Sequence, residues 1–252
     1  MNILKIFVVL SKIYGNNLFK NKMVFIADNR KEFKMLTYKI HLIRHGLTSG
    51  NLEGRFMGQR DDLSLCEEGR NEIEKLVEEF DYPKIQKLYI SPMKRCQETA
   101  DIIYPNTFRQ EIEELKEFDF GDFSGRKISE LKTEPEFIKF VEGKENGGRA
   151  PNGESTTEFN ARCKKALETI FYDMMENKIT NAGVVVHGGV IMSLLSQFSL
   201  PRQNYYDWVV ENGMGFTVLM TPQMWLRDEG FEVYHKLPYR IIEDYSDNDN
   251  DE

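Results

Sequence analysis

YKIHLIRHG, at residues 38–46, is an apolar, strand-like run that ends abruptly in arginine, histidine and glycine. In an open α/β sheet, ligands bind just beyond the carboxyl ends of the strands. Arg44 and His45 would stand at that position, and Gly46 would let the backbone approach a bound group closely. On this stretch alone, a strand end with solvated polar residues is an equally good interpretation.

A second stretch repeats this plan. AGVVVHGGVI, at residues 182–191, is a β-branched strand followed by His187, two glycines and a helix-like run. A third strand, at residues 87–90, leads into SPMKR, where we expect Ser91 to cap a helix and Arg95 to lie in its first turn. The helix dipole disfavours a cation there unless an anion lies beside it. Three strand ends would therefore bring four basic side chains to one phosphate site: Arg44, His45, Arg95 and His187.

Composition narrows the class of protein. The chain has 252 residues, of which 40% are hydrophobic, so one domain with a sizeable core is expected. A net charge of −8 argues against nucleic acid or an anionic membrane as a partner and suits a small anionic ligand. Three cysteines without a Cys-x-x-Cys pattern indicate free thiols in a reducing cytosol, so we expect a cytoplasmic protein. The sequence contains no run of transmembrane length.

The order of elements predicts the fold class. Strands and helices alternate from residue 38 onward, which is typical of an α/β protein, here a three-layer α/β/α sandwich around a mostly parallel sheet. Ser64 with Glu67, and Ser155 with Glu158, each predict a capping box at a helix start. Residues 213–221 and 231–236 predict a late hairpin.

Three segments are expected along the chain. Residues 1–36 show no clean hydrophobic period and are expected to be a poorly ordered extension. Residues 37–242 would form the α/β domain, and residues 243–252 a disordered acidic tail. Within the domain, residues 201–208 are an aromatic connector that could stack on an organic substrate, although ordinary packing is the preferred interpretation.

Acidic residues alternate with phenylalanines in LKEFDFGDFSG, at residues 115–125. One interpretation is an edge strand that turns into a loop with solvated carboxylates. The functional interpretation is a carboxyl group among aromatic rings, where desolvation favours the neutral form, as suits a general acid. We choose Glu117 over Asp119 and Asp122, although the sequence hardly separates the three.

Absent motifs exclude several phosphate chemistries. The sequence has no Gly-x-x-x-x-Gly-Lys-[Ser/Thr] motif, so it is not a P-loop NTPase. A cysteine phosphatase needs an arginine six residues after its nucleophile, and the cysteines here are followed at that spacing by Glu72, Ile102 and Thr169. No ligand cluster indicates a metal site, and no cofactor is expected. Histidine remains as the nucleophile.

Four motifs in order resemble the histidine phosphatase superfamily, also called phosphoglycerate mutase-like. They are RHG at residues 44–46, Arg95 in SPxxR, Glu117 in EFxFGDFxG, and HGG at residues 187–189. The resemblance runs from about residue 38 to residue 219 and implies His45 as the phosphorylated nucleophile and Glu117 as the proton donor. It also implies that four side chains hold the phosphoryl oxygens: Arg44, Asn51, Arg95 and His187. The remaining substrate contacts would come from Gly46, Leu47, Thr48, Ser49, Gly50, Met57, Gly58 and Gly188.

The function expected from this resemblance is metal-independent hydrolysis of a small phosphorylated metabolite. A neutral imidazole, with a reference pKa of about 6.5, can attack phosphorus in line. PNGES, at residues 151–155, resembles the phosphatase branch that includes the α-ribazole phosphatases, which this chain resembles most. A phosphoglycerate mutase is the first alternative, but family mutases usually carry a longer insertion after the acidic motif. A non-catalytic phosphate-binding protein is the second, disfavoured because all five central residues are present.

Overall fold

The computed structural model describes residues 36–143 and 147–240. The predictions of an N-terminal extension and of an acidic tail fall almost entirely on residues outside these ranges. In the described part of the chain, no helix combines the length and the apolar character needed to cross a membrane.

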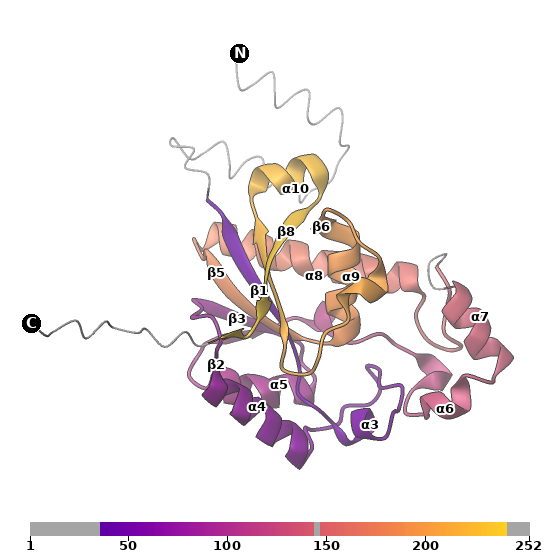
Figure 1. Ribbon diagram of the computed structural model, residues 1–252. Coiled ribbons are helices and arrows are strands. Elements are labelled where there is room, and N and C mark those ends of the chain that lie inside the picture. Colours follow the sequence, from indigo (N-terminus) through magenta and orange to yellow (C-terminus); the bar gives the residue numbers. More distant parts are fainter. Residues whose placement is uncertain (1–35, 144–146, 241–252) are drawn as a thin grey trace, which may run out of the picture.

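Seven strands form the central sheet, in the order β4-β3-β5-β1-β7-β8-β6 (Figure 1). Their bounds are β1 Tyr38–Arg44, β3 Lys87–Ile90, β4 Arg109–Glu111, β5 Asn181–Val186, β6 Ser199–Leu200, β7 Gly215–Met220 and β8 Phe231–Leu237. Neighbouring strands are parallel except where β7 pairs with β1 and β8. A separate short ladder joins β2 (Phe80–Asp81) to β9 (Tyr239–Arg240). The predicted mostly parallel sheet is confirmed.

Helices connect these strands. The α-helices are α3 Ser49–Leu52, α4 Glu67–Glu79, α5 Lys94–Ile103, α6 Ile128–Leu131, α7 Pro135–Gly143, α8 Thr156–Glu176, α9 Gly188–Phe198 and α10 Pro222–Asp228. Short 3-10 helices are η1 Glu113–Leu115, η2 Gly121–Phe123 and η4 Tyr205–Trp208. Figure 1 shows α6 and α7 at one side of the sheet, away from β2 and β3.

Two separate cores lie on opposite faces of the sheet. Side chains alternate between the faces of a strand, so Val184 and Val186 of β5 pack with α8 and α9, whereas Val185 packs with α4 and α5. Ile73 of α4 and Ala100 of α5 belong to this second core. Helices therefore cover both faces, which confirms the three-layer α/β/α sandwich.

Two of the local predictions are wrong. α4 is capped by Cys66, whose Sγ accepts from the Gly69 backbone 3.4 Å away, and not by a Ser64–Glu67 box. α5 begins at Lys94 with Met93 at its N-cap, and the Ser91 hydroxyl bonds to His187.

Two other local predictions agree with the structure, one fully and one in part. The Ser155–Glu158 box at the start of α8 is confirmed. The predicted hairpin exists as the antiparallel pair β7–β8, but α10 lies between its strands.

Candidate active site

The carboxyl ends of β3, β5 and β1 lie side by side at one edge of the sheet. Arg44, the last residue of β1, pairs with Val186, the last residue of β5. The His45 backbone donates to the Val186 carbonyl at 2.9 Å, and the Ser91 backbone donates to the Val185 carbonyl at 3.1 Å. The predicted convergence of the three strand ends is therefore confirmed, and the side chains that follow them share one site.

His45 has a fixed tautomer. Its Nδ1 lies 2.7 Å from the Gly46 carbonyl, which can only accept, so Nδ1 carries the proton and Nε2 keeps its lone pair. Burial, and then the charges of Arg95 and Arg44, lower the pKa of His45 well below its usual value. The side chain amide of Asn212 holds the His45 carbonyl at 2.8 Å. A neutral, oriented imidazole whose Nε2 keeps its lone pair, here facing the Arg95 Nε–H group, suits a nucleophile.

Arg95 lies between the two histidines. Its Nε is 3.2 Å from His45 Nε2 and 3.2 Å from His187 Nδ1, and its side chain is buried. The imidazole rings have their centroids 5.1 Å apart. The carbonyl of Asp61 accepts from Arg95 Nη1 at 2.8 Å. A buried cation held by carbonyls, and facing two imidazole nitrogens, is a strong site for an anion.

His187 is oriented by Ser91, the residue that was expected to cap a helix. Its Nε2 lies 2.8 Å from Ser91 Oγ, and because Nδ1 accepts from Arg95, Nε2 carries the proton. Burial and the charge of Arg95 lower the pKa of His187 well below its usual value. Cys96 Sγ lies 3.6 Å from the same Nε2, but burial raises the pKa of this thiol to about 12. Cys96 is therefore a neutral neighbour, not a thiolate.

Arg44 presents an unused donor. Its Nη1 donates to the Val210 carbonyl at 2.7 Å, while its buried Nε has no hydrogen-bond partner among the described residues. Burial lowers the pKa of Arg44, and the negative charge of Glu117 acts against that shift. A Cβ placed on Gly188 would lie 3.3 Å from Arg44 Nε, so this glycine leaves room beside the guanidinium. Buried donors without partners are uncommon and indicate a missing acceptor.

Glu117 is distinguished from the other two acids of its motif by its position. Its two carboxylate oxygens accept from the Phe118 backbone at 2.8 Å and from the Gly189 backbone at 3.0 Å, and the side chain is buried. Asp119 instead pairs with Arg60 at 2.7 Å, and Asp122 accepts from Asn152 at the surface. The segment is also not the edge strand of the alternative interpretation, since it carries η1 and η2.

The predicted rim residues surround the nucleophile in different ways. Thr48 caps α3 and hydrogen-bonds with Asn51 Oδ1, which leaves the Asn51 amide nitrogen to donate to a ligand. Gly50 lies against Met57, which a Cβ at residue 50 would strike, and Gly58 contributes a carbonyl 3.4 Å from Arg95 Nη2. Ser49 is exposed.

Gly46 and Leu47 approach α4. A Cβ on Gly46 would lie 2.9 Å from Ile73 Cγ1, and the Leu47 carbonyl accepts from the Cys66 backbone at 3.1 Å. The close approach expected at Gly46 is therefore made by α4.

Arg162 and Glu154, which sequence reasoning did not identify, together hold the backbone around Glu117. Arg162 of α8 donates to the carbonyls of Lys116 at 2.7 Å and Glu117 at 3.2 Å. It also pairs with Glu154 at 2.6 Å, and Glu154 Oε1 accepts from the Asp119 backbone at 2.8 Å. Glu154 could have been found from the sequence, because it belongs to the PNGES stretch. No sequence pattern marks Arg162, because a single arginine on an amphipathic helix is common.

Within residues 36–143 and 147–240, no group of three or more His, Cys, Asp or Glu side chains is arranged to hold a metal ion. The polar groups that converge at the strand ends are instead cations, neutral imidazoles and one carboxylate.

Residues 40–225 match the model of the histidine phosphatase superfamily (branch 1). The chain therefore belongs to this superfamily, whose members are phosphatases or mutases. Among its relatives, phosphoglycerate mutase-like protein 4 of Arabidopsis thaliana is 34% identical over 162 residues, which cover 62% of this chain and 69% of that protein.

Solved structures share the fold. The α-ribazole phosphatase from Shigella flexneri aligns with a TM-score of 0.66 at 20% identity, covering 81% of this chain and 99% of that one. A phosphoglycerate mutase from Thermus thermophilus aligns with a TM-score of 0.56 at 24% identity, covering 79% and 98%. These similarities confirm the phosphoglycerate mutase-like architecture.

Proposed function

We propose that this protein is a phosphomonoester hydrolase that acts on a small phosphorylated metabolite through a phosphorylated His45, without a metal ion. The observation that carries the proposal is the placement of Arg95 Nε at 3.2 Å from both His45 Nε2 and His187 Nδ1. A phosphoryl group in front of His45 Nε2 would meet two donors, this guanidinium and the unpaired Nε of Arg44, with the His187 ring beside it. Such preorganised donors stabilise the negative charge of the phosphoryl group in the transition state.

In the first step, His45 Nε2 attacks phosphorus in line. The new P–N bond forms as the P–O bond to the alcohol breaks, and the leaving oxygen takes a proton from Glu117. Glu117 is placed for this role, because its buried carboxylate is fixed by the backbone of Gly189, two residues after His187. A positioned acid typically contributes about 10²–10⁴-fold to the rate.

In the second step, water attacks the phosphohistidine. Its oxygen bonds to phosphorus as the P–N bond breaks, its proton passes to the Glu117 carboxylate, and inorganic phosphate leaves. Nε2 of His45 is thereby restored, and Nδ1 keeps its proton on the Gly46 carbonyl throughout.

Hydrolysis is preferred to mutase chemistry for two reasons. The segment between Glu117 and α8 holds only η2 and the short helices α6 and α7 among its described elements, in line with the shorter insertion expected of phosphatases. Its PNGES stretch supports the acidic motif through Glu154. α-Ribazole 5′-phosphate is the first substrate to test, given the solved relative of that activity. Phosphoglycerate mutase is the second candidate, because relatives carry that name.

The deciding experiment measures turnover of α-ribazole 5′-phosphate and 3-phosphoglycerate by phosphate release, and formation of 2-phosphoglycerate by NMR. Hydrolysis should persist in EDTA, and quenched enzyme should carry an acid-labile phosphate that His45→Asn lacks. Loss of activity in EDTA with recovery on adding a divalent ion, an acid-stable phosphoenzyme, or conversion of 3- to 2-phosphoglycerate without phosphate release would each contradict the proposal.

A further inference from the structure

A cavity of about 230 Å³ opens among α8, α9 and η4, outside the phosphate site. It lies near Glu117, because its wall includes Phe118, the next residue, and Tyr205, whose hydroxyl is close enough to feel the charge of Glu117. It continues along α9, since Ser196 also lines it and lies two turns beyond Gly189, the residue that donates to Glu117. Two turns of an α-helix span about 11 Å and return to the same side. The cavity therefore extends away from Glu117 along α9.

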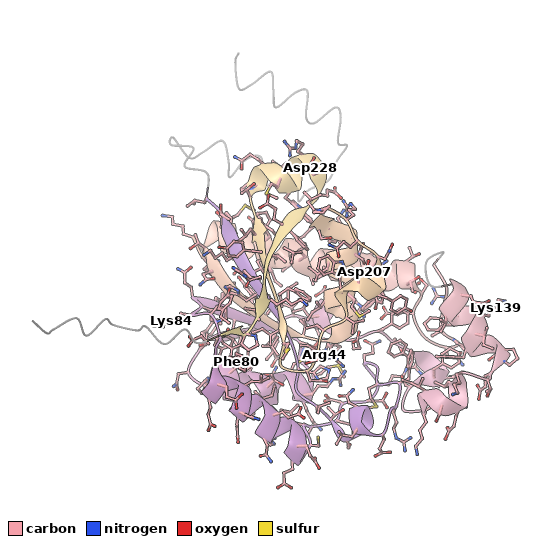
Figure 2. All side chains as sticks on the ribbon, in the orientation of Figure 1. Arg44, Phe80, Lys84, Lys139, Asp207 and Asp228 are labelled. Carbon is pink, nitrogen blue, oxygen red and sulfur yellow. The ribbon has the colours of Figure 1, made fainter. Side chains whose placement is uncertain are left out.

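The walls are mainly aromatic. The rings of Phe118 and Phe159 meet edge to face with centroids 5.0 Å apart, and those of Tyr205 and Tyr206 do so at 5.3 Å. Figure 2 labels Asp207, which follows Tyr206 in η4. The preferred packing interpretation of the aromatic connector is correct for Trp208, which is buried against Phe216, but Tyr206 is 58% exposed at the cavity.

The wall also carries polar groups, namely the Asn160 amide and the hydroxyls of Thr156, Ser196, Tyr205 and Tyr206. Asn160 accepts from Ser193 through Oδ1 at 2.8 Å, so its amide nitrogen is left to donate. Ser196 donates its hydroxyl to the Ser193 carbonyl at 3.2 Å, so its oxygen can still accept. Every described residue that lines the cavity is uncharged. A carboxylate or ammonium group entering it would lose hydration without gaining a partner, which is costly.

The place of this cavity relative to the reaction follows from in-line attack. The leaving oxygen lies on the side of phosphorus opposite His45 and next to the acid that protonates it. The alcohol attached to that oxygen must therefore continue past Glu117. η4 is tied to the same site, because the chain runs from Tyr205 to Val210, whose carbonyl holds Arg44. Burial, and to a smaller extent the charge of Glu117, raise the pKa of Tyr205, so this hydroxyl stays neutral.

We propose that this aromatic pocket (Phe118, Phe159, Asn160, Ser196, Tyr205 and Tyr206) binds the leaving alcohol and selects phosphomonoesters of uncharged alcohols that carry an aromatic ring. The inference rests on the proposed function and names its substrate class. A cavity of about 150 Å³ holds a benzene ring, so the pocket has room for a single or fused ring. Esters whose alcohol carries a carboxylate, such as phosphoserine and 3-phosphoglycerate, are disfavoured.

The test separates binding from turnover. Calorimetry measures the Kd of benzyl-, 2-phenylethyl- and 3-phenylpropylphosphonate against methyl-, ethyl- and propylphosphonate, and of 3-phosphonopropionate as the anionic probe. These compounds offer a phosphoryl-like anion that cannot be hydrolysed. At least one phenylalkyl compound should bind tenfold or more tightly than its alkyl partner, and 3-phosphonopropionate should bind no better than propylphosphonate. Equal Kd values across the series, or tightest binding of the anionic probe, overturn the proposal.

Variants locate the preference. Tyr206→Ala should reduce it about three- to tenfold, as expected for loss of one aromatic contact, and Ser196→Phe should abolish it by filling the pocket while methylphosphonate still binds. Tyr234→Ala is the matched control, because this tyrosine is 56% exposed on β8. An equal effect of Tyr234→Ala, or none from Tyr206→Ala and Ser196→Phe, assigns the preference elsewhere and overturns the pocket.

Turnover of the corresponding phosphates then distinguishes the two proposals. Hydrolysis of phenylalkyl and alkyl phosphates with equal kcat/KM overturns the pocket and leaves the hydrolase intact. A clear binding preference without phosphate release contradicts the hydrolase and leaves the pocket as a ligand site.

Discussion

At the scale of single residues, the site is defined by which nitrogen of each side chain donates and which accepts. His45 uses Nδ1 for the Gly46 carbonyl and keeps Nε2, and His187 uses Nε2 for Ser91 and keeps Nδ1. Arg44, labelled at the end of β1 in Figure 2, keeps its Nε. Both imidazole nitrogens accept from Arg95 Nε, and an incoming anion would meet the Arg95 guanidinium and Arg44 Nε.

Glu117→Gln tests the general acid. This change removes the proton but roughly preserves the shape, so alkyl phosphates, whose alkoxides are strongly basic, should lose about 10²–10⁴-fold in rate. p-Nitrophenyl phosphate releases a stable phenolate that needs little protonation. The rate of its first step, transfer of the phosphoryl group to His45, should therefore be largely unchanged. A burst of nitrophenol, measured by stopped-flow absorbance, should precede slow hydrolysis of phospho-His45.

Asp119→Asn and Asp122→Asn serve as matched controls, because both acids pair away from the site. Neither should discriminate between the two kinds of ester. If the selective loss appeared at Asp119 or Asp122, or if Glu117→Gln slowed both substrates equally, the general acid would have to be reassigned.

The buried neutral histidines predict a loss of stability in acid. The folded-state pKa values of His45 and His187 lie below the unfolded value of about 6.5, so the unfolded state binds more protons as the pH falls below it. Above that value their contribution to stability is fully present. Between pH 6.5 and 5, the free energy of unfolding should fall by about 1.4 kcal/mol per pH unit for each histidine that stays neutral.

Urea unfolding of the wild type and of His187→Asn at pH 7.5, 6.0 and 5.0 measures this slope. The variant should show a shallower pH dependence, because one buried imidazole is removed. An unchanged slope in His187→Asn would mean that other groups account for the acid sensitivity.

At the scale of elements, two helices hold Glu117 in place, one through its carboxylate and one through its backbone. α9 begins at Gly188 and supplies the N–H group that binds Glu117, while a Cβ at Gly189 would lie only 2.4 Å from the same carboxylate. α8 holds the acidic segment from behind through Arg162 and its partner Glu154. The position of Glu117 therefore depends on two helices that are distant from it in sequence.

Arg162→Lys should lower kcat for alkyl phosphates about 10- to 100-fold with little change in KM, because misplacement of a catalytic group by about 1 Å can cost this much. Lysine cannot reproduce the planar fork that serves several acceptors at once. Steady-state kinetics on an alkyl and an aryl phosphate provide the measurement, and the aryl ester should be less affected.

Arg227→Lys is the control, since Arg227 forms a surface pair with Asp228 on α10 and its side chain is 79% exposed. Its kinetics should match the wild type. Equal losses on alkyl and aryl esters in Arg162→Lys would indicate general disruption of the site and not displacement of the acid.

At the scale of the whole molecule, two cores built from residues between 36 and 240 lie on the two faces of one sheet. The central strand β1 contributes to both cores, with Leu42 on one face and Ile43 on the other. His41 lies within this strand and is held by Thr217 and Asn181, as suits a structural role.

Removal of residues 1–34 should leave folding and turnover intact, because their sequence has no hydrophobic period that would bury against a core. The truncated chain should melt within about 2 °C of the full chain by calorimetry, since changes away from packed features typically alter stability by less than about 0.5 kcal/mol. A large drop in Tm would show that this segment packs on the domain.

The chemistry of the strand ends was readable from local sequence alone. Short motifs state which side chain follows a strand, and parallel strands must present their carboxyl ends together, so the sequence was enough to group Arg44, His45, Arg95 and His187. Helix capping was less predictable, because Ser91 bonds to His187 and Cys66 replaces Ser64 as the cap of α4, neither of which the sequence reveals. The sequence favoured Glu117 but hardly separated it from its two acidic neighbours; the fold does so, because Gly189 of α9 binds Glu117 while Asp119 and Asp122 pair elsewhere. The parts played by Arg162, Val210 and the aromatic pocket were decided by tertiary structure. These contacts join segments 45 to 166 positions apart, often through backbone carbonyls, which every residue carries and no motif can reveal.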